Sequence, residues 1–189
     1  MRLIDTFLIL IFFVLIHLIT ACATQRVSTI VGCNYNDKKN QTDYFVFPYG
    51  SVSIPDKWEK SNYNSVSRQQ FLKNKDSITM AIAFGLCNKF EFNANGNKTG
   101  FDFVKLYYEW DSKYYVDSHG LNREIIEKDS IDSYMIWRLY GTYQNDKIDN
   151  YFLFGAKNCT VSNFMILNTD KWTKAKKLDF LKVLYKKRN

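Results

Sequence analysis

Short apolar segments separated by turn residues run through the first half of the chain, and they predict β-hairpins. The apolar segments 44–47 and 51–54 flank a compact turn, and the segments 65–72 and 77–85 flank another. Within the last of these segments, large apolar side chains recur at every second position, which predicts a strand with one buried face. These side chains are Ile78, Met80, Ile82 and Phe84.

A helix is expected after the Asn- and Gly-rich segment 93–100, where the alternating pattern stops. Apolar side chains then recur at spacings of three and four as far as Gly120, which should end the helix. They are Phe103, Leu106, Tyr107, Trp110 and Tyr114. We expect this face to pack on the sheet. Tyr108 and Tyr115 fall off it, so they are predicted to be exposed and to contribute to an interaction surface.

Further strands and a second helix are expected in the last third of the chain. Apolar segments at 123–126, 133–143, 150–154 and 160–167 predict a meander of about four strands. A final helix should follow residue 170, with an apolar stripe of Trp172, Ala175, Leu178, Leu181 and Tyr185. The rest of its surface carries lysines that could also take part in an interaction surface, namely Lys174, Lys177, Lys182 and Lys186.

The order of hairpins, helix, meander and helix predicts one α+β domain over residues 44–189. We expect an antiparallel β-sheet of about seven or eight strands that is covered by two main helices. Residues 22–43 are mostly small and polar and show no sustained period, so they are predicted to form a tether. Fully extended, such a tether would reach about 70 Å.

The longest apolar run lies at the N-terminus, where residues 8–19 are almost wholly Leu, Ile, Phe and Val. A run of this length that ends in small residues is typical of a signal peptide, here residues 1–21. Its end, Ile19-Thr20-Ala21-Cys22, resembles the lipobox of bacterial lipoproteins. The resemblance implies cleavage before Cys22, lipidation of its thiol and acylation of the new amino terminus with palmitate or a similar chain.

An uncleaved membrane anchor is the alternative, because residues 6–25 carry no charged side chain and are long enough to span a bilayer. Either anchor would place the rest of the chain in the bacterial cell envelope. Ala23 follows Cys22, where an Asp would resemble the inner-membrane retention signal of enterobacteria. We therefore expect a periplasm-facing protein, with the outer membrane favoured.

Positive charge is concentrated at the C-terminus. The net charge is +7, and residues 170–189 hold eight Lys and Arg side chains against two Asp. A chain that is otherwise close to neutral does not have the distribution of a nucleic-acid binder, and no nucleic acid is expected as a partner. A basic final helix near a membrane favours contact with anionic lipid or with an acidic protein.

If Cys22 is lipidated, three cysteines remain, and one disulfide among Cys33, Cys87 and Cys159 would leave one thiol free. The sequence does not choose the pair. It contains no C-x-x-C, and its two histidines lie far from any cysteine cluster, so neither a structural zinc site nor another cofactor is expected.

Residues 44–84 and 168–185 resemble the opening and the closing helix of PsbP-like domains. In those domains an aromatic hairpin leads to an Ile-Pro-x-x-Trp step and then to a strand with a late Phe. The matching residues here are Ile54, Pro55, Trp58 and Phe71. All are packing positions, and the resemblance implies a binding or assembly module and not an enzyme.

Catalytic motifs such as G-x-S-x-G, H-E-x-x-H and glycine-rich phosphate loops do not occur in the sequence. We therefore expect a non-enzymatic, lipid-anchored envelope protein that binds a protein partner, with a toxin-neutralising immunity lipoprotein as one variant. The alternative is an envelope hydrolase that uses carboxylates. The candidate carboxylates are Glu109, Asp111, Glu124, Glu127 and Asp129.

Overall fold

The computed structural model describes residues 29–189, which form two antiparallel sheets, two α-helices and three short 3-10 helices. The first sheet has the order β1-β2-β3, with β1 (Ile30–Asn36), β2 (Gln41–Phe47) and β3 (Gly50–Pro55). The second has the order β4-β5-β6-β10-β9-β8-β7, with β4 (Trp58–Asn64), β5 (Gln69–Asn74), β6 (Thr79–Leu86), β7 (Asn122–Asp129), β8 (Tyr134–Tyr143), β9 (Asp146–Lys157) and β10 (Thr160–Ile166). The helices are α2 (Gly100–His119), α3 (Lys174–Lys186), η1 (Asp37–Lys39), η2 (Cys87–Lys89) and η3 (Glu91–Asn93).

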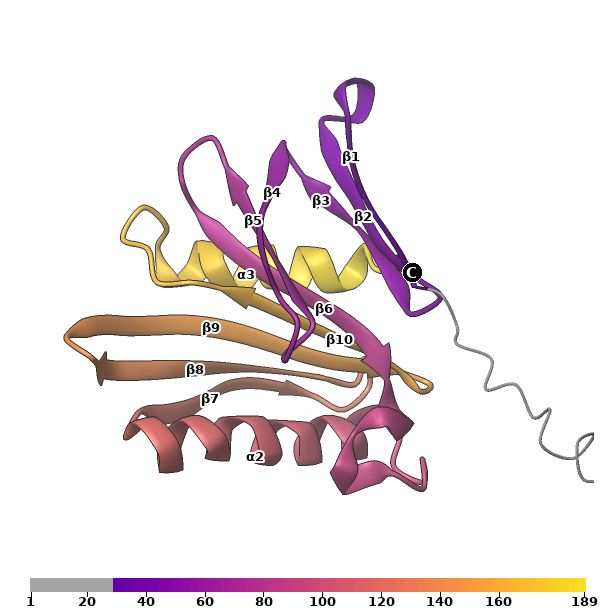
Figure 1. Ribbon diagram of the computed structural model, residues 1–189, viewed down its shortest axis with the longest axis vertical. Coiled ribbons are helices and arrows are strands. Elements are labelled where there is room, and N and C mark those ends of the chain that lie inside the picture. The colour runs from indigo at the N-terminus through magenta and orange to yellow at the C-terminus, as the bar shows by residue number, and fades with distance from the viewer. Residues whose placement is uncertain (1–28) are drawn as a thin grey trace, which may run out of the picture.

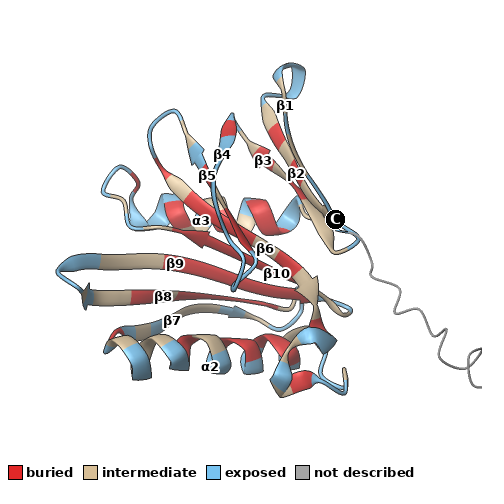
Figure 2. Ribbon diagram, in the orientation of Figure 1, coloured by how far each residue is buried: buried red, intermediate tan, exposed pale blue. Residues whose placement is uncertain are grey.

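The seven-stranded sheet is covered on both faces. Helix α2 packs on β7, β8 and β9 from one side, whereas α3 packs on β9 and β10 from the other side and also contacts β3 (Figure 1). Alternate residues of one strand therefore enter different cores: Ile136 of β8 lies in the core under α3, and Trp137 lies in the core under α2. The buried residues concentrate in the central strands β6, β10, β9 and β8 (Figure 2).

The predicted α+β class is confirmed: an antiparallel sheet of seven strands is packed against two helices. Strand β6 shows the predicted alternation, because Met80 and Ile82 are buried under α3 and Ala81 lies on the α2 side. The additional three-stranded sheet was not anticipated as a separate layer.

The prediction of a tether extending to residue 43 is wrong for residues 30–43. Strand β1 pairs with β2 along its whole length, from Ile30 opposite Phe47 to Asn36 opposite Gln41. The inward residues Cys33 and Tyr44 contact the core under α3, which supplies the apolar burial that stabilises this hairpin. The signal peptide, the lipobox and Cys22 lie outside the described residues.

Helix α2 is rotated relative to the predicted face. Its buried residues are Phe103, Val104, Tyr107, Tyr108 and Ser112, and Tyr114 of the predicted face is 58% exposed. Tyr108 is thus not an exposed interaction residue, because its ring packs against Trp137 at 5.5 Å and lies under the guanidinium of Arg123 at 5.0 Å.

The lysines of α3 differ from one another more than the sequence predicted. Lys174 and Lys186 are exposed, but Lys177 is only 3% exposed and its ammonium lies 5.0 Å from the centre of the Tyr151 ring. Burial lowers the pKa of Lys177. Lys182 is half-buried and pairs with Glu127 at 3.0 Å. Ala175, predicted for the apolar stripe, is exposed.

Within residues 29–189, neither helix is sufficiently long and apolar to cross a membrane.

Candidate functional site

A groove opens on the α2 side of the seven-stranded sheet. Helix α2 packs mainly on β7, β8 and β9, and the neighbouring part of this face, formed by β10 and β6, lies beside the groove. The groove has a volume of about 370 Å³ and is bounded by α2, by the residues after β6 and by the β4–β5 turn. We call it the α2 groove.

Small residues in β6 create the space. Ala81, Ala83 and Gly85 occupy the positions that face α2, while the large residues of the strand face the other core. A Cβ atom added to Gly85 would find no atom within 4 Å. The floor of the groove is therefore backbone and small side chains, which leaves room for a ligand to approach the sheet.

Asp111 lines the α2 groove from the helix, and one of its carboxyl oxygens is buried. The residue is half-buried, and no donor among residues 29–189 reaches its Oδ2 atom. Burial raises the pKa of Asp111 from 3.8 to about 7, because the charged form loses its solvation. Near neutral pH this carboxyl group is thus divided between the protonated and the ionised form.

Asn163 of β10 presents a second acceptor of the same kind. The residue is 5% exposed, and its Nδ2 atom donates to the Tyr107 hydroxyl at 3.1 Å. Tyr107 is held in place by stacking on Phe154, with ring centres 4.1 Å apart. The Oδ1 atom of Asn163 has no donor in the described part of the chain. We call Asp111 Oδ2 and Asn163 Oδ1 the two open acceptors.

Aromatic side chains form the rim of the α2 groove beside these acceptors. Phe90 contacts Tyr107 at 4.8 Å and Trp110 at 6.0 Å between ring centres. Trp110 is 42% exposed, and its Nε1 atom donates to Glu91 at 2.6 Å, which fixes the indole ring. An ordered, partly exposed Trp next to a polar pocket is typical of protein-binding surfaces.

Opposite charges lie at the mouth of the groove. Arg68 of the β4–β5 turn and Lys89 of η2 line the groove together with Glu91 and Asp111. The pKa of Asp111 is raised by burial. The site therefore combines acceptors inside with basic side chains at the mouth.

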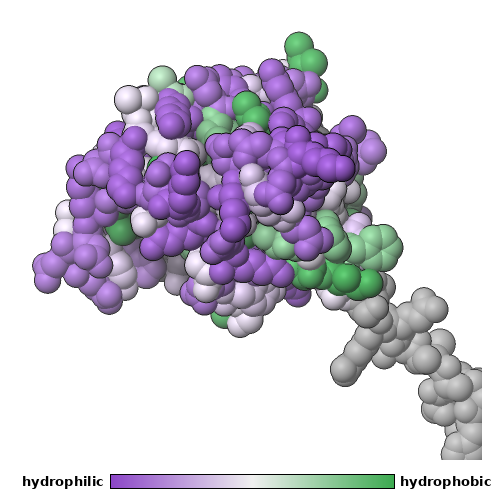
Figure 3. Space-filling model, turned by 90° about the horizontal axis from the view of Figure 1, so that it is seen from above, coloured by the Kyte–Doolittle hydropathy of each residue, from purple (hydrophilic) through white to green (hydrophobic). Residues whose placement is uncertain are grey.

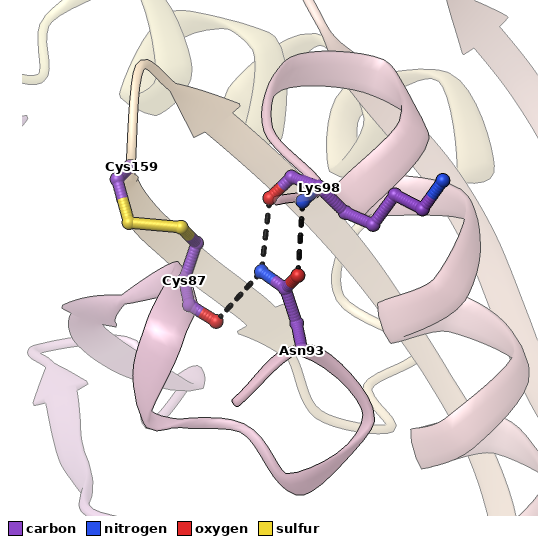
Figure 4. The surroundings of a disulfide bond; sticks show 4 residues. All are labelled: Cys87, Asn93, Lys98 and Cys159. Atoms are coloured by element: carbon purple, nitrogen blue, oxygen red, sulfur yellow. Dashed lines mark hydrogen bonds between the residues drawn. A yellow bond between two sulfur atoms is a disulfide. The ribbon is translucent and has the colours of Figure 1, made fainter. Parts of the chain in front are cut away.

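A disulfide holds the wall of the groove that follows β6. Cys87 is bonded to Cys159 in the β9–β10 turn (Figure 4). The Cys87 amide also donates to the Cys159 carbonyl at 2.8 Å. The disulfide resolves the pairing that the sequence left open, and among the described cysteines Cys33 is free. The bond fixes the start of the 87–99 segment to the end of the sheet.

The Asn93 side chain closes the same segment. Its Nδ2 atom donates to the carbonyls of Cys87 at 3.0 Å and Lys98 at 2.9 Å, and its Oδ1 atom accepts from the Lys98 amide at 3.0 Å (Figure 4). Asn93 is 3% exposed and uses both ends of its amide in these bonds. The position of Phe90 and Glu91 at the rim is thus fixed at both ends of the short loop.

In overall structure the chain is similar to a cyanobacterial protein. The solution structure of cyanobacterial PsbP (CyanoP) from Synechocystis sp. PCC 6803 matches with a TM-score of 0.46 and 10% sequence identity. The match covers 89% of this chain and 96% of that chain. No family model matches the sequence, and neither does any curated protein. We transfer no function from this likeness.

The predicted site residues do not come together in one place. Tyr115 lines the α2 groove, and burial raises its pKa, but Tyr108 is buried beneath the helix. The lysines of α3 lie on the opposite face of the sheet. The predicted interaction surface is therefore two separate regions.

The candidate carboxylates are also separate. Asp111 lies in the α2 groove, whereas Glu109 pairs with Arg123 at 2.8 Å. Glu127 accepts from the Tyr134 hydroxyl at 2.6 Å and from Lys182, and these bonds lower its pKa. Asp129 accepts two backbone amides of the β7–β8 turn. Within residues 29–189, no three His, Cys, Asp or Glu side chains are grouped so that they could hold a metal ion.

Proposed function

We propose that this chain is a non-enzymatic binding protein of the bacterial cell envelope, anchored by lipid at Cys22, with the α2 groove as its binding site. The observation that carries the proposal is the pair of open acceptors at the floor and wall of the groove. Buried acceptors cost stability unless a donor reaches them. Both residues line the α2 groove, and unpaired acceptors beside a groove are typical of a site that a ligand completes.

The ligand that suits the groove is a polypeptide segment of a partner protein. A backbone amide or an amine would supply the donors that the open acceptors need, and a cation would also favour the ionised form of Asp111. Trp110 and Phe90 offer the aromatic contact that anchors such segments. Arg68 and Lys89 at the mouth suit acidic residues that flank the inserted group.

Two further observations support the cellular setting. The Cys87–Cys159 bond is consistent with an oxidising, extracytoplasmic compartment. The apolar N-terminal run and the lipobox resemblance supply the membrane anchor, with a periplasm-facing outer-membrane location favoured. A toxin that the protein neutralises is one partner class, and it requires a toxin gene beside this gene.

A hydrolase remains the second candidate, because a carboxyl group with a pKa of about 7 in a cleft suits general acid–base chemistry. The two functions predict different results for the variant Asp111→Asn. In an enzyme, Asp111→Asn abolishes turnover and leaves binding of the substrate in place. In a binding protein, Asp111→Asn weakens the complex itself.

Crosslinking from the groove tests the binding function. Val66 lines the α2 groove and Ile131 lies in the β7–β8 turn, and both side chains are 93% exposed. We expect p-benzoylphenylalanine at position 66 of the full chain, irradiated in cell membranes, to give one discrete protein adduct. The same group at position 131 should give none.

A variant in which a side chain fills the groove provides the control for this crosslinking experiment. Gly85→Leu extends a side chain into the open space above β6 and should leave the melting temperature almost unchanged. The adduct at position 66 should then disappear. An adduct that persists at full yield in Gly85→Leu, or no adduct at position 66 in the unfilled chain, would rule out the groove as the binding site.

A further inference from the structure

The outer face of the three-stranded sheet carries an apolar patch. Ile30 lies opposite Phe47 in the β1–β2 register, and these side chains are 58% and 62% exposed. The Phe45 ring lies across Gly32, where an added Cβ would come within 2.2 Å of the ring. Together with exposed Pro48, these side chains form what we call the outer patch, namely Ile30, Phe45, Phe47 and Pro48. Apolar surface is visible at the side of the domain where the described residues begin (Figure 3).

The C-terminus adds a basic side chain next to this patch. Asn189 exchanges two backbone hydrogen bonds with Ser51, at 3.0 and 2.9 Å, so the last residues extend the sheet beside β3 (Figure 1). The Arg188 side chain turns inward and donates to Ser162 at 2.7 Å. Lys187 lies beside β3, because its carbonyl accepts from the Ser53 amide at 3.4 Å. Lys186, the last residue of α3, lines a separate pocket together with Ile131 and Asp132. Lys186 and Lys187 are both exposed.

Negative charge is sparse around the outer patch. The segments that meet there, residues 44–55 and 180–189, contain no Asp or Glu. Asp43 lies on the same face toward the other end of β2, where Ser53 at 2.6 Å and Gln41 at 2.9 Å donate to it. The face is thus apolar with a basic border.

The length of the chain before β1 limits how far this face can lie from the proposed lipid anchor at Cys22. Only residues 23–29 separate Cys22 from Ile30, and they can span at most about 28 Å. The reach of the link is less than half that of the predicted tether, because residues 30–43 are strand, turn and strand. The outer patch begins at the residue where this short link enters the domain.

We propose that the outer patch docks on the surface of an anionic lipid bilayer. The proposal rests on the anchor in the proposed function and adds an orientation to it. Ile30 and Phe47 enter the interface between head groups and acyl chains, and Lys187 lies against the anionic head groups. A short link holds the patch close to the bilayer, so even weak apolar and charge contacts are made at high effective concentration.

The test uses the full chain reconstituted in vesicles and a matched pair of aromatic positions. Phe47 is 62% exposed in the outer patch, and Tyr114 is 58% exposed on α2. With p-benzoylphenylalanine at one position or the other, irradiation should attach lipid at position 47 and far less lipid at position 114. The yield at position 47 should be higher in vesicles that contain phosphatidylglycerol than in phosphatidylcholine alone.

Lysine substitutions give a quantitative test of docking. Lys187→Gln should lower the ratio of docked to undocked protein by about five-fold in phosphatidylglycerol vesicles. The matched double variant Lys38→Gln with Lys39→Gln, in exposed η1 at the other end of the β1–β2 hairpin, should change nothing.

Each remaining outcome counts against the docking proposal. Equal lipid adducts at positions 47 and 114, or adducts at position 47 that join two copies of the chain, overturn it while the protein stays attached to the vesicles. Protein that is released from the vesicles overturns the anchor, and the docking proposal with it. Flotation of the vesicles before irradiation distinguishes these two failures.

Discussion

Replacing Cys87 and Cys159 together with alanine is expected to lower the free energy of unfolding by about 4 kcal/mol. The bond joins residues 72 apart in the sequence, so it removes much of the freedom of the unfolded chain. In a domain of this size the loss corresponds to a melting temperature lower by about 10 °C. Urea denaturation of the full chain measures the change, and proteolysis should show cleavage within residues 88–99.

Cys33→Ala is the control, because this thiol is free and half-buried. It should cost about 1 kcal/mol or less. If the double alanine variant were as stable as the parent protein, the bond would not fix the groove wall in solution. The raised pKa of the Cys33 thiol, caused by burial, also makes it slow to exchange with the disulfide.

Asp111→Asn is expected to change the free energy of unfolding by an amount that depends on pH. The change should favour the variant more at mildly alkaline pH than at mildly acidic pH, by on the order of 3 kcal/mol. The folded state raises the pKa of Asp111 from 3.8 to about 7, so the folded protein binds more protons than the unfolded chain between these values. Stability of the parent protein therefore falls as pH rises through this window. The variant, which has no carboxyl group at this position, should lack that part of the slope. Urea denaturation at a series of pH values measures it.

Asp179→Asn provides the matched control, since Asp179 is an exposed carboxylate on α3. It should leave the pH dependence of the parent protein unchanged. Equal slopes for Asp111→Asn and the parent protein would mean that the Asp111 carboxyl group is solvated or paired in solution. A residue that costs stability and whose loss weakens partner binding is typical of a functional site.

The strands were predictable where large apolar side chains recur at every second position of the sequence. The α3-facing row of β6 is apolar at every second position, and the structure places it in the core. The β1 strand was missed because its outward positions are Gly32, Asn34 and Asn36. Its inward residues, Val31, Cys33 and Tyr35, do alternate with them, so a weaker form of the same signal was present.

The rotation of α2 shows where residue type misleads. Leu106 and Trp110 are apolar but partly exposed, whereas Ser112 is polar and fully buried. Ser112 donates to the Tyr108 carbonyl and accepts from Arg123, so its burial is compensated by hydrogen bonds that the sequence does not reveal. The predicted stripe therefore shares Phe103 and Tyr107 with the buried face of the helix but misses Ser112.

The α2 groove could be predicted only in fragments. Asn163 is a polar residue within an apolar strand, and Ala83 and Gly85 are small residues at period two, and each is a signal of an unusual environment. None of them indicates that β6 and β10 lie beside Asp111, because that neighbourhood depends on the strand order of the whole sheet. The Cys87–Cys159 pairing depends on the same topology.

Titration of Asp111 itself is the most direct test of the claim that the groove keeps an acceptor open for a partner. In the full chain, the ¹³C chemical shift of the Asp111 carboxyl carbon, assigned with Asp111→Asn, should follow a midpoint of about 7. A midpoint close to the value of about 4 for an ordinary aspartate would contradict the account, because the carboxylate would then already be solvated or paired.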